Sequence, residues 1–332
     1  MNIDFGDRTS EVIIERGAIG RIGGLIRHTG KMLVVTDAGV PAVYAEKVCA
    51  AFDGARIMTL PEGESCKSFA VYESICEKLL SDGFLRGDAV TAVGGGAVCD
   101  VAGFAAATYM RGIDFYSVPT TLLAQVDASV GGKNAVDVCG IKNVVGTFYQ
   151  PKKIVIDPDV LSTLGKRQLS CGFAEIIKVA ATLDAALFGE LERGTDADGL
   201  TRVIERAVAA KAKIVAEDEK DRGTRRVLNF GHTAGHGIEA CTGLLHGECV
   251  ALGMLCMCSE SVFGRLRDVL EKYGLPTCAD INGNDVLRAL SLDKKSDSDG
   301  IVAVFAKEIG KYEILKITAD DMLKRIKRVV RM

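Results

Sequence analysis

Three of the chain's four histidines, His232, His236 and His246, fall in one short, glycine-rich stretch that is followed by Glu248. Imidazole binds transition metals and exchanges protons near neutral pH. A cluster of this kind therefore predicts a metal site or an acid–base centre rather than three unrelated structural histidines. His28 lies apart in a polar stretch, and we expect it to be solvated.

His232 and His236 lie four residues apart, which places both side chains on one face of a helix. This spacing alone favours the two residues as a pair of zinc ligands, as in the HExxH motif. Position 233 is a threonine, however, so the general-base glutamate of a zinc protease is missing.

Charged residues also occur where an apolar helix is expected. Glu175 and Lys178 lie three residues apart in the stretch GFAEIIKVAA. Because lone buried charges are costly, these two must pair, bind a metal or face a cleft. Lys211, Arg225 and Asn229 could be ordinary solvated residues, but Arg225 and Asn229 are four apart and come directly before the histidines.

Gly94, Gly95 and Gly96 follow a strand-like segment and precede a helix-like one. Backbone N–H groups and a helix dipole at such a turn can hold a pyrophosphate, and a Cβ atom would keep phosphate oxygens away. The pattern is neither GxGxxG nor GxxxxGK[ST], so a tight turn is the alternative. Asp37, at the end of an earlier strand, suits either a ribose hydroxyl or a structural cap.

A second polar segment contains residues 120–121, Asp127, residues 131–133, Lys142 and Asn143. Its hydroxyl groups and lysines suit recognition of a phosphate or a polyol. The alternative interpretation is a solvated loop.

The first half of the chain alternates strand-like and helix-like segments. The expected strands are 32–37, 55–60, 88–93, 115–119 and 152–158, with residues 1–14 as an edge strand. The expected helices are 41–52, 68–83 and 97–110, with a further loop and helix after residue 120. Such alternation predicts a parallel sheet covered by helices, with ligands at the carboxyl ends of the strands.

Beyond about residue 159 long helical periods dominate, with one hairpin expected near 301–317. The sequence therefore predicts an α/β Rossmann-like parallel-sheet domain at residues 1–159 and a mostly α-helical domain at residues 160–332. Two domains are also the expectation for a chain of 332 residues.

Composition excludes several classes of protein. A net charge of −3 without a long basic run gives no electrostatic footprint for nucleic acid. The eleven cysteines are scattered without a CxxC pair, which favours reduced thiols in a cytoplasmic protein. The N-terminal residues do not resemble a signal peptide, and the longest apolar stretch, residues 249–258, is too short to cross a membrane.

Together these motifs resemble the 3-dehydroquinate synthase family. The matching stretches run in family order from about residue 32 to residue 310, and they are PEGESCKS, GGGAVCDVAGFAAATYMRG, VPTTLLAQVDASVGGKNAVD, KNVVGTFYQP, GFAEIIK, RRVLNFGHTAGHGIE, LHGECVALGM and LDKKSDSDG. A collinear set of this length is far more specific than a single glycine loop.

The resemblance implies a carbon–oxygen lyase of the shikimate pathway, which leads to chorismate and the aromatic amino acids. The enzyme would convert 3-deoxy-D-arabino-heptulosonate 7-phosphate into 3-dehydroquinate and phosphate. Bound NAD would oxidise the substrate transiently, phosphate would leave, the hydride would return, and an intramolecular aldol addition would close the ring. A divalent metal, Zn²⁺ or Co²⁺, would polarise the oxidised oxygen, and a cytoplasmic homodimer is expected.

The resemblance also implies a role for each site residue. Metal would be held by Glu175, His232 and His246, while His236 would serve the substrate side as a proton relay. The implied catalytic residues are Lys178, His236, Asp127 and Lys211. The implied substrate-binding residues are Arg111, which would reach across a dimer interface, Lys133, Asn143, Arg225, Asn229, and Lys294 or Lys295. The implied cofactor-binding residues are Glu62, Gly63, Glu64, Lys67, Gly94, Gly95, Gly96, Asp100, Thr120, Thr121, Asp127, Lys133, Lys142, Leu161 and Thr163.

Three positions depart from the family pattern: Cys99 replaces a glycine, Asn134 a threonine and Ala234 an aromatic residue. Cys99 bears on the nucleotide loop because it adds a side chain there. Two alternatives share the fold, namely another sugar-phosphate cyclase and a metal-dependent polyol or glycerol dehydrogenase. The dehydrogenase would carry an aspartate in place of Glu175. A binding protein without catalytic activity would have no reason to hold the whole set.

Overall fold

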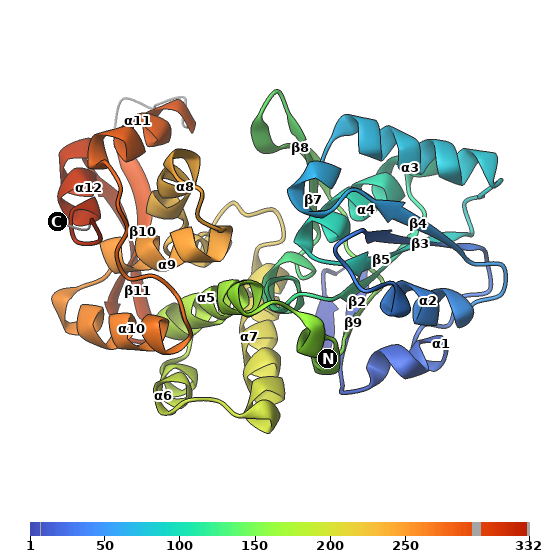
Figure 1. Cartoon of the computed structure of the whole chain (residues 1–332), viewed down its shortest axis with the longest axis horizontal. Helices are drawn as coiled ribbons and strands as arrows, with labels where there is room; N and C mark the ends of the chain where they lie inside the picture. The colour runs from blue at the N-terminus through green and yellow to red at the C-terminus, as the bar shows by residue number, and fades with distance from the viewer. Residues whose placement is uncertain (7, 294–299, 331–332) are drawn as a thin grey trace. The chain divides into compact units, whose positions relative to one another are not determined.

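The computed structural model describes residues 1–6, 8–293 and 300–330 of the chain, which divides into two compact units, Met1–Gly165 and Lys166–Met332. Figure 1 colours the first unit from blue to green and the second from green to red. The first unit continues past the expected boundary at residue 159 because a short 3-10 helix, Pro158–Thr163, buries Val160 in its core.

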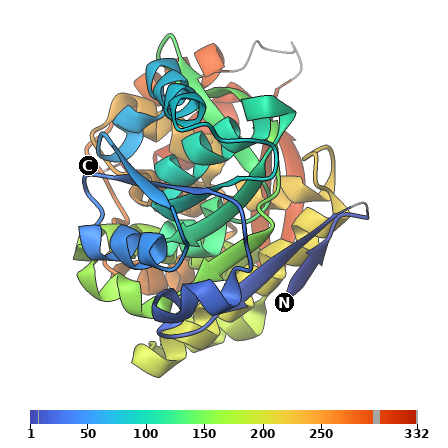
Figure 2. The same ribbon diagram turned by 90° about the vertical axis from the view of Figure 1, so that its right-hand side faces the viewer.

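A seven-stranded sheet in the order β1-β2-β9-β6-β5-β3-β4 forms the centre of the first unit as described. Its strands are β1 (Asn2–Asp4), β2 (Thr9–Ile14), β3 (Met32–Asp37), β4 (Arg56–Leu60), β5 (Ala89–Gly94), β6 (Asp114–Pro119) and β9 (Lys153–Ile156). The first two strands pair antiparallel, as the dark blue arrows of Figure 2 show, and the other neighbours pair parallel. The predicted parallel-sheet architecture is confirmed.

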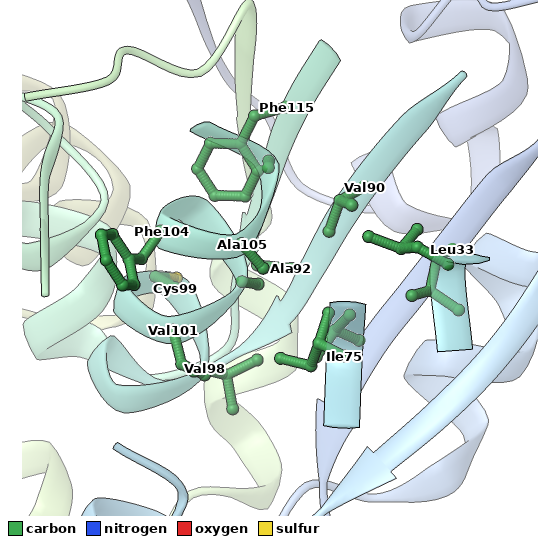
Figure 3. Close-up of a cluster of buried hydrophobic side chains, with 14 of the residues drawn as sticks. Leu33, Ile75, Val90, Ala92, Val98, Cys99, Val101, Phe104, Ala105 and Phe115 are labelled. Atoms are coloured by element: carbon green, nitrogen blue, oxygen red, sulfur yellow. The ribbon is translucent and has the colours of Figure 1, made fainter. Parts of the chain in front are cut away.

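Helices cover both faces of this sheet, which explains why β3 and β5 are buried along their whole length. The helices are α1 (Ile22–Leu25), α2 (Ala42–Ala50), α3 (Phe69–Ser81) and α4 (Gly96–Thr108). One core cluster joins α1 and α2 to the sheet, through Ile22 and Val48 among others. The other joins α3 and α4 to the opposite face, where Ile75 of α3 and Val98 of α4 belong to the same cluster as Val90 of β5 (Figure 3).

The segment after β6 differs from the expected loop and helix. It forms one turn of π-helix, Ala124–Ala128, and then an antiparallel hairpin of β7 (Lys133–Val138) and β8 (Ile141–Phe148). The first half also contains short 3-10 helices at Ala18–Arg21, Gly63–Cys66 and Tyr109–Arg111.

The second unit is mostly helical, as predicted. Its helices are α5 (Lys166–Leu183), α6 (Ala185–Arg193), α7 (Ala197–Glu217), α8 (His232–Cys241), α9 (His246–Cys256), α10 (Glu260–Lys272), α11 (Gly283–Asp293) and α12 (Ala319–Ile326), with a 3-10 helix at Thr224–Asn229. The expected hairpin is present as β10 (Ile301–Glu308) and β11 (Lys311–Ile317). Among the described residues, no helix combines the length and the apolar character that crossing a bilayer requires.

Candidate functional site

The predicted nucleotide-binding residues of the first unit lie at the carboxyl ends of its parallel strands. Gly94, the last residue of β5, is in register with Pro119 at the end of β6, and Asp37 ends β3. The strand order reverses between β3 and β5, because β4 follows β3 on one side while β5 lies on the other. Ligands of open α/β sheets bind at such a switch point.

The glycine loop has no room for larger side chains. A Cβ atom on Gly94 would lie 2.7 Å from Val98, and one on Gly96 would lie 3.0 Å from Ala128. Gly95 is the N-cap of α4, which begins at Gly96, and it offers no side-chain hydrogen bond to the first N–H groups of the helix. Cys99 does not alter this surface, since its thiol is buried 3.4 Å from the Ser117 hydroxyl and forms part of the core (Figure 3).

Asp37 organises the loop beside the glycines. One carboxylate oxygen accepts a hydrogen bond from the Gly39 N–H at 2.8 Å, and the other accepts one from the Gly63 N–H at 3.3 Å. In this structure Asp37 therefore acts as a structural cap for the neighbouring loops. Glu62 and Glu64 flank Gly63, whose φ of +66° suits glycine.

A partly buried polar network connects three of the predicted site residues. The Lys67 ammonium donates to an Asp100 carboxylate oxygen at 2.6 Å and also to the side-chain oxygen of Asn143. The hairpin carrying Asn143 is fixed by Asp137, whose N–H donates to the Lys67 carbonyl and whose carboxylate accepts from the Asn143 N–H. The structure therefore joins Lys67 and Asp100, expected at the cofactor, to Asn143, expected at the phosphate.

Asp127 belongs to the π-helix, which packs against the glycine loop. Ala128 of the same turn is the nearest side chain to Gly96. Turns of this kind are rare and often occur at functional sites. The fully buried Gln125 amide fixes the turn by donating to the carbonyls of Pro119 and Asp157. Sequence reasoning did not single out Gln125.

The remaining predicted residues of the first unit are spread over its loops. Thr120 is buried directly after β6, and its N–H donates to the Gly94 carbonyl. Lys133 and Lys142 are exposed on the hairpin, and Arg111 adopts a φ of +66° after α4. The short helix Pro158–Thr163 carries the last two, Leu161 and Thr163.

In the second unit, glycines allow α8 and α9 to approach closely. Gly231, at a φ of +79°, is the N-cap of α8 and directly precedes His232, and a Cβ atom there would lie 2.7 Å from the Val250 carbonyl oxygen. A Cβ atom on Gly253 of α9 would overlap the Gly231 carbonyl oxygen. Only glycine permits this backbone contact, which holds the beginning of α8, with His232, against α9.

Helix α5 is fixed against α9 in a similar way. A Cβ atom on Gly247 would lie 2.5 Å from the Cα atom of Cys171. Arg167 of α5 donates two hydrogen bonds, of 2.6 and 2.7 Å, to the Glu248 carboxylate at the beginning of α9. Glu248 also caps α9 by accepting from the Leu245 N–H. These contacts hold the first turn of α9 next to α5.

Glu175, His232 and His246 come together as a group that can hold a metal ion. The Nε2 atoms of both histidines lie 3.7 Å from the same oxygen, Oε1 of Glu175. Zinc binds nitrogen and oxygen at about 2.0–2.1 Å, so tetrahedral ligands lie about 3.4 Å apart. The two separations from Glu175 exceed this value by about 0.3 Å, and all three ligand atoms lie within 4.8 Å of one another, which suits a shared ion.

Hydrogen bonding at the other ring nitrogens suits the same ion. Nδ1 of His232 lies 3.2 Å from the Phe230 carbonyl, and Nδ1 of His246 lies 3.0 Å from a Glu239 carboxylate oxygen. Since both oxygens can only accept, each Nδ1 carries the proton, and in a neutral ring Nε2 presents a lone pair. Three electron-rich atoms then face each other.

Glu175 Oε1 has no hydrogen-bond donor within the part of the chain that the structure describes, although it is fully buried. Leaving a carboxylate oxygen in this state is costly, and a cation removes the cost. Its second oxygen forms an ion pair with the Lys178 ammonium. The residues present therefore fit a divalent metal.

Other predicted residues of this unit are buried cations and their neighbours. Lys178, Lys211 and Arg225 are each less than a tenth exposed. The Arg225 guanidinium donates to the Glu219 carbonyl at 2.7 Å, and Asn229 ends the same 3-10 helix. His236 is exposed one turn after His232. Lys294 and Lys295 lie outside the described residues.

A doubly wound sheet with a glycine loop before a helix, and a helical unit with a Glu–His–His group, define the class of metal-dependent enzymes that use a dinucleotide. Residues 57–171 match the family model "3-dehydroquinate synthase N-terminal", and residues 172–296 match "3-dehydroquinate synthase C-terminal". The chain belongs to the 3-dehydroquinate synthase family.

Individual proteins agree with this assignment. The chain is 39% identical to the 3-dehydroquinate synthase of Thermoanaerobacter sp. strain X514, over 98% of this chain and 99% of that one. It is 41% identical to that of Caulobacter vibrioides, over 95% and 94%. A 2-epi-5-epi-valiolone synthase from Streptomyces hygroscopicus subsp. jinggangensis 5008, solved with NAD⁺ and Zn²⁺ bound, superposes with a TM-score of 0.87 at 27% identity, over 96% of each chain.

Proposed function

We propose that this protein is a 3-dehydroquinate synthase, which converts 3-deoxy-D-arabino-heptulosonate 7-phosphate into 3-dehydroquinate and phosphate. The relatives at 39% and 41% identity over nearly the whole chain carry that name. The observation that carries the chemistry is the buried Glu175 Oε1, which lacks a hydrogen-bond donor among the described residues and faces two histidine Nε2 atoms. Aromatic biosynthesis is the corresponding role.

The cofactors of the proposed reaction are NAD⁺ and a divalent metal, with zinc or cobalt as the candidates. When bound, they supply transient oxidation of a ring hydroxyl and polarisation of its oxygen. Glu175, His232 and His246 would hold the metal, and three protein ligands leave positions open for substrate oxygens. The Gly94–Gly96 turn and Asp100 would hold the dinucleotide.

The chain's own polar residues would bind the substrate and transfer its protons. Lysine, arginine and asparagine donors suit a doubly charged phosphate, and we assign this role to Lys133, Asn143, Arg225 and Asn229. Arg111 and the Lys294–Lys295 pair are assigned with them. Lys178, Lys211 and Asp127 would orient hydroxyl and carboxylate groups, and His236, exposed beside His232, would relay protons. The remaining cofactor contacts would be those of the loops around Glu62–Lys67, Thr120–Thr121, Lys142 and Leu161–Thr163.

Two further properties belong to the proposal. We expect a homodimer, and we expect a cytoplasmic enzyme with reduced thiols. Cys66, Cys99 and Cys256 are buried, and burial raises the pKa of each of these thiols to about 12, which keeps them protonated and unreactive.

A phosphate-release assay tests the proposed function. We expect release from the heptulosonate phosphate that requires NAD⁺, stops when a chelator is added and returns with Zn²⁺ or Co²⁺. NADH should not accumulate, because the hydride returns to the substrate. Accumulating NADH with glycerol and no phosphate release would favour the dehydrogenase alternative. Faster turnover of sedoheptulose 7-phosphate or glucose 6-phosphate would favour another cyclase.

The Asp100 carboxyl gives a pH-dependent prediction. Burial raises its pKa to about 6, although the nearby Lys67 ammonium acts in the opposite direction. Burial lowers the pKa of Lys67, but Asp100 and Glu64 outweigh it and the net shift is upward, so the ammonium stays charged. The ionised Asp100 carboxylate accepts a hydrogen bond from a ribose hydroxyl more strongly than the protonated acid does. We therefore expect the Kd for NAD⁺ to be constant above about pH 7 and to rise below pH 6, by up to about tenfold per pH unit.

Isothermal titration between pH 5 and 8 measures this dependence, with Asp100→Asn as the comparison. The variant should bind more weakly and lose the dependence on pH. The pH dependence of folding stability has the opposite sign to that of NAD⁺ binding. A raised carboxyl pKa favours the folded state at low pH, and this contribution is lost as pH rises through about 6. A Kd for the unmodified protein that stays flat down to pH 5 would contradict the role of Asp100.

A further inference from the structure

Glu239 on α8 contacts a residue of the proposed metal site although it is not itself one of the three ligands. Its carboxylate oxygen lies 3.0 Å from Nδ1 of His246, which begins α9. The Glu239 side chain is 18% exposed, whereas that of His246 is 35% exposed. His246 is thus the more accessible of the two histidines that face Glu175, since the His232 side chain is 14% exposed.

The hydrogen bond decides which nitrogen of His246 faces the metal position. A carboxylate accepts and His246 Nδ1 donates, which leaves Nε2 pointing toward Glu175 Oε1 at 3.7 Å. His232 reaches the same state through a backbone carbonyl, which the fold of the chain already fixes. His246 depends on a side chain instead. A carboxylate partner also increases the basicity of a ligating imidazole more than a neutral carbonyl does.

We propose that Glu239 is a positioning residue of the metal site, which holds the His246 ring with Nε2 toward the ion and strengthens metal binding. This inference rests on the proposed function, because it requires the ion at Glu175, His232 and His246. It adds a residue to that site which is neither a ligand nor a substrate contact.

A second interpretation of the same atoms is less favourable. His236, Glu239 and His246 also form a group whose ligand atoms lie within 4.8 Å of one another. An ion there would have to bind His246 through Nδ1 while Nε2 serves the first ion, so the imidazole would lose both protons. The 3.0 Å separation between Nδ1 and the carboxylate is an ordinary hydrogen-bond length, which places a proton between them.

Metal binding by the full chain tests the role of Glu239. Zn²⁺ affinity is measured by competition with a zinc-binding dye, the number of ions by elemental analysis, and ligand geometry by the visible absorption of the Co²⁺ form. We expect one ion per chain, and a Kd for Zn²⁺ about 10–100-fold higher in Glu239→Ala. Glu239→Gln should lose less, because its amide oxygen still accepts from Nδ1, and the Co²⁺ bands should shift in the order of the Kd values.

Two further variants separate this proposal from the metal site itself. Glu175→Gln should abolish tight binding, and Glu205→Ala, which removes an exposed glutamate from α7, should bind like the unmodified protein. If Glu175→Gln loses the metal while Glu239→Ala keeps the original Kd and Co²⁺ spectrum, Glu239 has no positioning role. A second ion that disappears in Glu239→Ala would make Glu239 a ligand and overturn the proposal.

An unmodified chain that binds no metal would overturn both this proposal and the proposed function. Circular dichroism checks the fold, and Glu239→Gln, with unchanged volume, decides the case if Glu239→Ala unfolds.

Discussion

Replacing Glu175 by glutamine is expected to remove the metal and to lower the rate of phosphate release on the order of 10³-fold. A divalent ion contributes several kcal/mol of transition-state stabilisation, and each 1.4 kcal/mol corresponds to a factor of ten. Glutamine keeps the size of the side chain, which matters because Glu175 is 1% exposed. Its amide has no charge with which to hold the ion or to pair with Lys178.

Glu192→Gln is the matched control for this experiment. It makes the same isosteric change in the same unit, where Glu192 of α6 accepts two hydrogen bonds from Arg265 at the surface. Exposed ion pairs contribute little, so the control should keep its metal and stay within about twofold of the original rate. Elemental analysis and the phosphate assay give both results. A Glu175→Gln protein that retains its metal would exclude Glu175 as a ligand.

The first unit shows which parts of the fold local sequence can predict. The run 32–37 became β3 (Met32–Asp37) because consecutive apolar residues before an acid are typical of a strand buried on both faces. The hairpin of β7 and β8 was not predicted. Its identity depends on distant contacts, such as the hydrogen bond from Asp137 to Lys67, and its polar and glycine residues are equally typical of a loop.

The metal group shows a similar limit. Spacing within one helix favours His232 with His236, but the structure places His246 and Glu175 with His232. Helix α8 ends at Cys241 and α9 begins at His246, so the chain reverses and returns the third histidine to the first. Periodicity cannot report such a reversal, and only the family resemblance indicated it. Glu239 was missed for the same reason, because its contact crosses that turn.

Replacing Gly253 by alanine is expected to destabilise the second unit and weaken metal binding together. The added Cβ atom would overlap the Gly231 carbonyl oxygen and lie 2.8 Å from the Gly235 nitrogen. Both atoms belong to the backbone, so α8 and α9 must separate rather than a side chain rotate. Overpacking of this kind costs about 3 kcal/mol, which lowers Tm by roughly 6 °C or more.

The same movement shifts His232 with respect to His246, since Gly231 immediately precedes His232 and Gly253 lies on the helix that His246 begins. We therefore expect a higher Kd for Zn²⁺ in addition to the lower Tm, although no ligand is changed. Scanning calorimetry of the metal-free protein measures the first effect, and dye competition measures the second.

Gly264→Ala provides the control, because a Cβ atom on Gly264 of α10 would meet no atom within 4 Å. Alanine favours a helix over glycine by about 0.5–1 kcal/mol, so this variant should keep or slightly raise Tm and leave the Kd for Zn²⁺ unchanged. Equal Tm values for the two variants would mean that the α8–α9 contact relaxes without cost. A lower Tm for Gly253→Ala with an unchanged Kd would mean that the position of His232 does not depend on this contact.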